Sequence, residues 1–280
     1  MAYLDNFNHQ FYGPETGSPE PRKWIFIHGL MGFGQNWRRI ISGLEKTERC
    51  LAFDQRGHGR SFKPESGYSP EDYADDLKKI VDELGWKKFN LVGHSMGGRN
   101  VLVFASKYPE YVDKLVIEDI GPESSANAHE YYAYLLNLAP TPFASRDEAR
   151  KFFAEDFIQK AKTRENVEVL SKFFYSNMEE KPDGTVDWRF SKYAIIESVK
   201  AGRNMDRWQE VRDLKVPTLL IRGESSQELS QQNYEAMLAS NPMIKGVVIP
   251  GAGHWVHSDQ AQAFVEALKS FVGDFPSPEK

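Results

Sequence analysis

Short apolar runs alternate with longer amphipathic stretches along this chain. The runs are three to five residues long and mostly apolar, as in strands that are buried on both faces of a parallel sheet. They lie at residues 24–27, 50–53, 89–92, 114–118, 218–221 and 247–249. Because amphipathic stretches separate them, the pattern predicts an α/β protein with a mostly parallel central sheet flanked by helices. A short leading strand is expected at 9–12, followed by a turn-rich linker.

The strongest helix signals surround residues 69–85. Ser69 can cap the helix, Pro70 suits its first position, and Asp72 completes a capping box. Tyr73 begins one apolar face, and a glycine at position 85 ends the helix. Other helices are expected at 35–44, directly after residue 95, and from about residue 258.

Between residues 121 and 213 the pattern changes. Aromatic-rich helical segments dominate, and no good strand is visible. A helical block between two strands of a sheet indicates an inserted lid, so we expect three parts. These are a first part of the core at 1–120, a lid at 121–213 and a second part of the core at 214–280. Most lid aromatics are expected to pack, and some to face the site.

Composition and charge narrow the classes of protein. The 280 residues are 40% hydrophobic and 27% charged, which is ordinary for a globular protein, and the net charge of −5 argues against a nucleic-acid partner. No apolar run approaches the roughly 20 residues of a membrane helix. The single cysteine, Cys50, excludes an intrachain disulfide, and the first residues lack a secretion signal. We therefore expect a cytoplasmic monomer or homodimer with no membrane partner.

The chemistry begins at residues 93–98, which read Gly-His-Ser-Met-Gly-Gly. They match Gly-x-Ser-x-Gly between a strand pattern and a helix pattern, which is the context of a nucleophile elbow. Gly93 and Gly97 allow strand and helix to approach closely. The turn would lift the Ser95 hydroxyl to a helix N-terminus, where free N–H groups favour a developing oxyanion.

A serine nucleophile needs a base and oxyanion donors. The candidate base is His254, on a glycine-rich loop after the last strand; its rival His257 is expected in an exposed polar role. Two histidines without a cluster of cysteines or carboxylates do not indicate a metal, and no metal or cofactor is expected. The oxyanion donors would be the backbone N–H groups of Met96 and Leu30, with Met31 second to Leu30. His28 would be structural.

The acid that orients the base could come from two loops. Asp119 follows the 114–118 strand, whereas the loop after the 218–221 strand offers Glu224 or Glu228. Asp119 is favoured because a carboxylate at a strand end points toward the catalytic edge, while Glu118 would face the other side of its strand. Either choice keeps the order serine, acid, histidine. The charged, glycine-containing loop at 54–61 is interpreted as structural.

Four motifs together carry a family resemblance. They lie at residues 28–32, 54–61, 93–98 and 251–255. The chain resembles the α/β-hydrolase superfamily over nearly its whole length, and within it the small bacterial esterase and thioesterase branch typified by YbfF. Members of that branch can carry the acid after the sixth strand in an Asp-Ile-x-Pro motif, which residues 119–122 match. The N-terminus departs from the family pattern, because we expect it to be too short for a full first strand.

The resemblance implies a serine hydrolase that cleaves esters or thioesters of small to medium acyl groups through an acyl-enzyme. Two alternatives stay open: a carbon–carbon bond hydrolase of ring-cleavage dienoates, and a non-catalytic ligand-binding protein on the same fold. Dehalogenase and epoxide hydrolase activities are disfavoured, because their nucleophile is aspartate and position 95 is serine.

Overall fold

The computed structural model describes residues 2–125, 127–163 and 166–274. Its main feature is a seven-stranded sheet in the order β1-β3-β2-β4-β5-β8-β9, parallel except for β1, which pairs antiparallel with β3 at one edge. The strands are β1 (His9–Tyr12), β2 (Lys23–Ile27), β3 (Arg49–Phe53), β4 (Phe89–His94), β5 (Val112–Glu118), β8 (Thr218–Gly223) and β9 (Ile244–Ile249). The predicted strands and the mostly parallel sheet are therefore confirmed.

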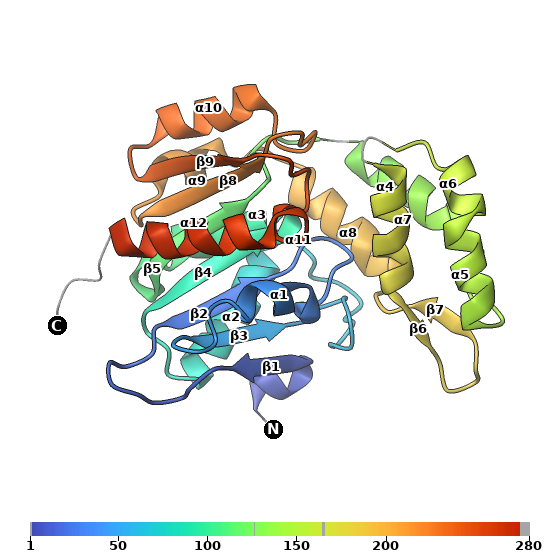
Figure 1. Cartoon of the computed structure of the whole chain (residues 1–280), viewed down its shortest axis with the longest axis horizontal. Coiled ribbons are helices and arrows are strands. Elements are labelled where there is room, and N and C mark those ends of the chain that lie inside the picture. The colour runs from blue at the N-terminus through green and yellow to red at the C-terminus, as the bar shows by residue number, and fades with distance from the viewer. Residues whose placement is uncertain (1, 126, 164–165, 275–280) are drawn as a thin grey trace.

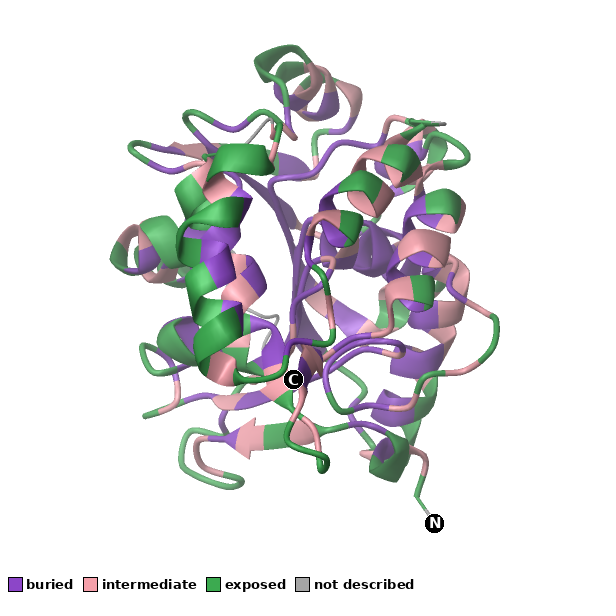
Figure 2. Ribbon diagram, turned by 90° about the vertical axis from the view of Figure 1, so that its right-hand side faces the viewer, coloured by how far each residue is buried: buried purple, intermediate pink, exposed green. Residues whose placement is uncertain are grey.

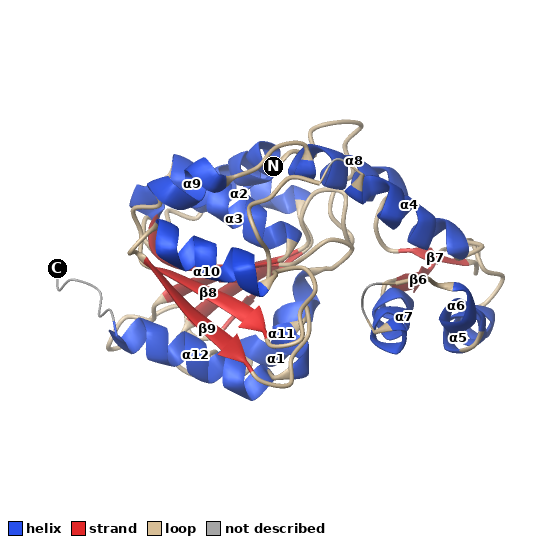
Figure 3. Ribbon diagram, turned by 90° about the horizontal axis from the view of Figure 1, so that it is seen from above, coloured by secondary structure: helices blue, strands red, loops and turns tan. Residues whose placement is uncertain are grey.

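Helices cover both faces of this sheet (Figure 3). One face carries α2 (Pro70–Glu83), α3 (Met96–Lys107), α9 (Trp208–Asp213) and α10 (Gln231–Ser240), and the other carries α1 (Arg38–Ile41), the short α11 (Val256–Asp259) and α12 (Ala261–Asp274). None of the described helices combines the length and the apolar character needed to cross a membrane.

Alternation along the strands divides the core into two layers. In β2, Ile25 and Ile27 pack into the layer beneath α2 and α3, while Trp24 and Phe26 pack into the layer beneath α1 and α12. All four side chains are almost completely buried. Figure 2 shows the sheet as a buried central layer with exposed residues on the outer faces of the helices. Both faces of the strands are apolar because helices cover both.

Of two predicted helices, one forms as expected and the other is mostly replaced by tighter turns. The capping box at the start of α2 is present: the Asp72 N–H donates to the Ser69 hydroxyl over 3.2 Å, and the Asp72 carboxylate accepts from the Ser69 N–H over 2.9 Å. The helix expected at 35–44 is instead a 3-10 turn (Gly34–Trp37) followed by one α-helical turn, α1. Beyond it the chain tightens again, because Gly43 N–H donates to the Ile40 carbonyl over 3.0 Å.

A helical block between β5 and β8 lies to one side of the core (Figure 1). It consists of α4 (Ala128–Leu138), α5 (Arg146–Ala154), α6 (Asp156–Lys160), α7 (Val167–Ser176), a β6–β7 hairpin (Met178–Glu180 and Val186–Trp188) and α8 (Lys192–Arg203), which leads back to the core. Its own core is aromatic, with Phe153, Phe157, Phe174 and Trp188 buried together.

The hairpin corrects the expectation that no strand lies in this block. Residues 182–184 read Pro-Asp-Gly, a turn sequence, and Gly184 adopts the left-handed φ of 85°. The strands are only three residues long, which is too short for an alternation pattern to stand out. At the other end of the predicted 121–213 lid, α9 packs Val211 into the core cluster beneath α2 and α3 rather than into the lid.

Candidate active site

Ser95 lies at the turn between β4 and α3. Its backbone has φ 53° and ψ −119°, a region that non-glycine residues rarely occupy, and it immediately precedes the first residue of α3. The flanking glycines are required by space: a Cβ at Gly97 would lie 2.5 Å from the His28 carbonyl oxygen, and one at Gly93 would lie 2.4 Å from the Gly97 carbonyl oxygen. The tight turn therefore holds the serine at the N-terminus of α3.

Asp119 and His254 form a buried hydrogen-bonded pair. Asp119 directly follows β5 with a left-handed φ of 52°, and its side chain is fully buried. Nδ1 of His254 donates to Oδ2 of Asp119 over 2.8 Å, joining residues 135 positions apart. His254 and Ser95 line the same pocket, beneath the lid residues Tyr132 and Phe173. The three residues that the sequence proposed as nucleophile, base and acid are thus brought to one place.

The loop after β8 supports Asp119 with donors. Oδ1 of Asp119 accepts from the Gly223 N–H over 3.0 Å, and Oδ2 accepts from the hydroxyl of Ser226. The two alternative acids make other contacts. Glu224 accepts from the Gly251 N–H over 3.0 Å, and Glu228 forms an ion pair with Arg203 at 3.1 Å. Hydrogen bonds to an ionised carboxylate stabilise its charge, so this loop suits Asp119 as an anion facing His254.

The expected oxyanion loop is a tight turn after β2. The Gly32 N–H donates to the Gly29 carbonyl over 3.0 Å, and Met31 between them has a φ of 62°. Leu30 lies in the same turn, and both Leu30 and Met96 line the recess around Ser95. The two residues proposed to supply the oxyanion donors therefore line the same recess as the nucleophile.

A chain of buried polar groups fixes this turn. Nε2 of His28 accepts from the Gln55 backbone N–H over 2.9 Å, and the Gln55 amide donates back to the His28 carbonyl over 2.8 Å. Asn100 on α3 donates to the Gln55 side-chain oxygen over 2.8 Å. Burial lowers the pKa of His28 to about 4, which keeps Nε2 an acceptor. The loop at 54–61 thus links the oxyanion turn to the helix after the elbow.

His257 departs from its expected exposed role. It is 5% exposed, and its Nδ1 lies 2.9 Å from both carboxylate oxygens of the fully buried Glu118. The Glu118 carboxylate also accepts the His257 backbone N–H over 2.9 Å. Sequence reasoning missed this pair, although Glu118 alternates away from Asp119 as expected. A charged residue ending an apolar strand was the available signal, since buried carboxylates need partners.

His94 lies between the two histidine–carboxylate pairs. Its ring centroid is 4.6 Å from that of His254 and 4.9 Å from that of His257. Ligand atoms of His94, Glu118 and His257 lie within 4.8 Å of one another, as donors to a metal would. However, Nε2 of His94 donates to the His254 carbonyl over 3.0 Å, and Glu118 is bound to His257. The cluster is therefore satisfied by its own hydrogen bonds. Burial, then His254, holds the pKa of His94 well below its usual value.

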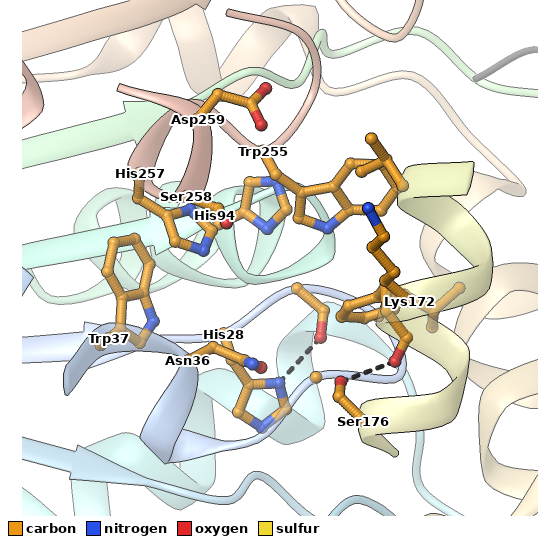
Figure 4. A pocket seen from close by; sticks show the side chains of 15 residues that line it. His28, Asn36, Trp37, His94, Lys172, Ser176, Trp255, His257, Ser258 and Asp259 are labelled. Atoms are coloured by element: carbon orange, nitrogen blue, oxygen red, sulfur yellow. Dashed lines mark hydrogen bonds between the residues drawn. The ribbon is translucent and has the colours of Figure 1, made fainter. Parts of the chain in front are cut away.

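A larger cavity opens on the other side of His94. Among the described residues its lining includes His257 and Asn36 from the core and Lys172 and Ser176 from α7, and its volume is about 350 Å³ (Figure 4). Ser95 does not line it. The pocket at Ser95, of about 40 Å³, shares with it a wall that contains Leu30, Phe173 and Trp255. Phe173 and Trp255 pack ring against ring at 5.4 Å, so lid and core aromatics together separate the two spaces.

A serine at a strand–helix elbow on a mostly parallel sheet defines a class of hydrolases. Comparison with known proteins agrees: residues 25–261 match the family described as the alpha/beta hydrolase fold, and the chain belongs to this family.

Relatives named as hydrolases and esterases span most of the chain. A 2-(acetamidomethylene)succinate hydrolase from Mesorhizobium japonicum is 28% identical over 248 residues, which cover 89% of this chain and 87% of that protein. Esterase YbfF from Escherichia coli is 27% identical over 253 residues, covering 89% and 92%. A crystal structure of E-2-(acetamidomethylene)succinate hydrolase superposes with a TM-score of 0.80 at 27% identity, covering 95% of each chain. The likeness to the esterase and thioesterase branch expected from the motifs is confirmed at this level.

Proposed function

We propose that this protein is a serine hydrolase that cleaves carboxylic esters of small to medium acyl groups. The observation that carries the proposal is the buried His254–Asp119 hydrogen bond of 2.8 Å beside the pocket that also contains Ser95. A serine hydroxyl is a poor nucleophile at neutral pH, and an adjacent, oriented imidazole is what activates it.

The proposed reaction has two halves. His254 takes the proton of the Ser95 hydroxyl as its oxygen attacks the ester carbonyl, and the oxyanion is held by the N–H groups of Leu30 and Met96. The protonated imidazole then gives its proton to the leaving alcohol, which departs and leaves an acyl-enzyme. Water repeats the sequence and releases the acid. Asp119 fixes the tautomer of His254 and stabilises the imidazolium.

The relatives support a hydrolytic reaction of this kind. One is named for hydrolysis of 2-(acetamidomethylene)succinate and another as an esterase. Thioesters fit the same chemistry, because the tetrahedral intermediate and its donors are the same. A cytoplasmic location belongs to the same proposal, as does a lid inserted between β5 and β8 that ends with α8 and does not include α9.

Hydrolysis of nitrophenyl esters from acetate to octanoate tests the proposal. Wild type should turn over the shorter esters, whereas Ser95→Ala and Asp119→Asn should each lose several orders of magnitude in kcat. Glu224→Gln is the matched control, because it removes a carboxylate from the loop that supports Asp119, and it should retain most of the activity.

Three results would count against the proposal. Turnover by Ser95→Ala near that of wild type would show that Ser95 is not the nucleophile. Loss of activity in Glu224→Gln, with activity retained in Asp119→Asn, would show that the acid lies in the loop after β8. Absence of ester hydrolysis by folded wild type would direct attention to dienoate substrates and then to ligand binding without catalysis.

A further inference from the structure

A second space is distinct from the large cavity, with which it shares only Leu30 among the described lining residues. It is a recess of about 30 Å³ next to the nucleophile, walled by apolar side chains such as Ile120 and Val199. This volume holds about two water molecules, so it suits a group the size of one carboxylate better than a long chain. The charged side chains that line it are both arginines, Arg99 and Arg203.

Arg99 is a buried cation whose hydrogen bonds go to backbone carbonyls. It is 2% exposed, and its two terminal nitrogens donate to backbone carbonyls, to Gly202 over 3.0 Å and to Glu123. Its Nε is buried and has no hydrogen-bond partner among the described residues. None of the ion pairs between described residues includes Arg99. Burial, then the charge of Arg203, lowers the pKa of Arg99 to about 9, so it remains cationic at neutral pH.

Arg203 adds a second cation at the end of α8. It forms an ion pair with Glu228, at 3.1 Å, which lines the neighbouring pocket at Ser95. The charge of Glu123 opposes that of Arg99, whereas Arg207 is engaged by Glu71 at 2.6 Å and by Glu210 at 2.8 Å. Among the described residues, the lining of the recess itself carries two guanidinium groups and no carboxylate, and a buried guanidinium whose Nε lacks a hydrogen-bond partner is stabilised by an anion that accepts from it.

We propose that this recess is the binding site for a carboxylate carried by the acyl part of the substrate. The inference rests on the proposed ester hydrolysis and names its substrate class: monoesters, or thioesters, of short dicarboxylic acids. Arg99 lies four residues after Ser95 and both line this small recess, so only a few carbon–carbon bond lengths separate a scissile carbonyl at Ser95 from Arg99. An acyl group whose carboxylate lies two or three carbons from the scissile carbonyl spans this separation.

The test compares two esters that differ only at the far end of the acyl chain. Mono-4-nitrophenyl succinate carries a carboxylate where 4-nitrophenyl butyrate carries a methyl group. Wild type should prefer the succinate ester in kcat/KM by about tenfold or more, the range expected for a charge-assisted hydrogen bond. Arg203→Gln and Arg99→Gln should reduce that preference by a similar factor, and Arg99→Lys should restore part of it.

Lys200→Gln is the matched control. It removes a cation from the same helix, α8, where Lys200 pairs with Glu197 at 2.9 Å away from the recess, and it should leave the preference as in wild type. Thermal melting identifies any Arg99 variant that fails to fold, and Arg203→Gln then carries the test. A wild-type preference for butyrate, or a preference unaltered by both arginine variants, would overturn the carboxylate site.

Failure of this inference is distinct from failure of the proposed function. If butyrate is hydrolysed through Ser95 without a preference for succinate, the carboxylate site is wrong and the esterase stands. If neither ester is hydrolysed, calorimetric titration of succinate and butanamide into wild type and Arg203→Gln decides the site alone. Succinate binding that is lost in Arg203→Gln would support it, and absence of succinate binding to wild type would refute it.

Discussion

At the scale of single residues, the elbow depends on the absence of a side chain at Gly97 as much as on Ser95. Gly97 faces two backbone oxygens that cannot rotate away, since a Cβ there would lie 2.5 Å from the His28 carbonyl oxygen and 2.6 Å from that of Ile27. A methyl group at this position must displace β2 or α3. The displaced end of β2 leads directly into the turn that contains Leu30. A single added Cβ atom at Gly97 would therefore disturb both the packing of β2 against α3 and the proposed oxyanion site.

We therefore expect Gly97→Ala to lose about 1–3 kcal/mol of unfolding free energy, the usual cost of overpacking. It should also lose more ester hydrolysis than the stability change explains, because the two proposed oxyanion donors move apart. Urea denaturation and kcat measured at a temperature where the variant is folded would check both. Gly273→Ala is the control, because a Cβ there meets nothing within 4 Å. Wild-type kcat in Gly97→Ala would contradict the coupling.

At the scale of elements, the 54–61 loop joins parts that are distant in sequence. Arg56 binds Asp76 of α2, with its Nε 2.6 Å from the carboxylate, and donates to the Gly67 carbonyl over 2.6 Å. Asp54 accepts from the Gly34 N–H over 2.7 Å and the Arg60 N–H over 2.9 Å. Hydrogen bonds and an ion pair thus hold this loop in place, in agreement with its interpretation as structural, and Gln55 links the oxyanion turn to α3.

Replacing Gln55 by leucine should reduce kcat for nitrophenyl esters by about tenfold to a hundredfold with little change in KM. The Gln55 side chain lines none of the space at Ser95, so its loss should not weaken substrate binding directly. The leucine leaves the His28 carbonyl and the Asn100 amide without their hydrogen-bond partner, and burying such unpaired groups costs about 1–3 kcal/mol of free energy. Initial-rate kinetics measure the split. Ser69→Ala on α2 is the control: losing this helix cap should cost about 1 kcal/mol of stability and leave kcat as it was. An increase in KM alone would contradict a positioning role.

At the scale of the whole molecule, the fold buries histidines in neutral form around the site. Burial lowers the pKa of His28 to about 4 and that of His58 to about 3, and His94 is shifted in the same direction. In the unfolded chain a histidine titrates near 6.5. Below that pH the unfolded chain binds protons at histidines that stay neutral in the folded protein. The stability contributed by these groups is therefore present above pH 6.5 and is lost as pH falls toward 4.

Unfolding free energy should accordingly fall from pH 7 to pH 5, by up to about 1.4 kcal/mol per pH unit for each neutral buried histidine. Urea titrations at half-unit steps of pH would give the slope. The Nδ1 of His58 lies 2.9 Å from the Arg56 carbonyl. His58→Asn removes this histidine, so the slope of unfolding free energy against pH should decrease by up to about 1.4 kcal/mol per pH unit, the contribution of one proton. A flat profile between pH 7 and pH 5, or the wild-type slope in His58→Asn, would contradict this account.

Local sequence determined much of the fold and the candidate site. The strands, the capped helix α2 and the elbow at Ser95 follow from apolar runs, a capping box and glycine spacing, all of which act within a few residues. Chain order and strand ends also indicate Asp119 and His254, which the fold joins by a hydrogen bond of 2.8 Å. Their catalytic roles, with those of Leu30 and Met96, stay predictions.

Only the tertiary structure decided which distant groups meet. Glu118 pairs with His257 across 139 positions, and Arg99 donates to the Gly202 carbonyl of α8 across 103 positions, although no local pattern identifies either partner. The β6–β7 hairpin likewise forms because the aromatic core of the lid buries its short strands. The physical reason is common to all three. Propensity and capping act through neighbours in the chain, whereas a buried charge or a short strand finds its partner only when the sheet register brings them together.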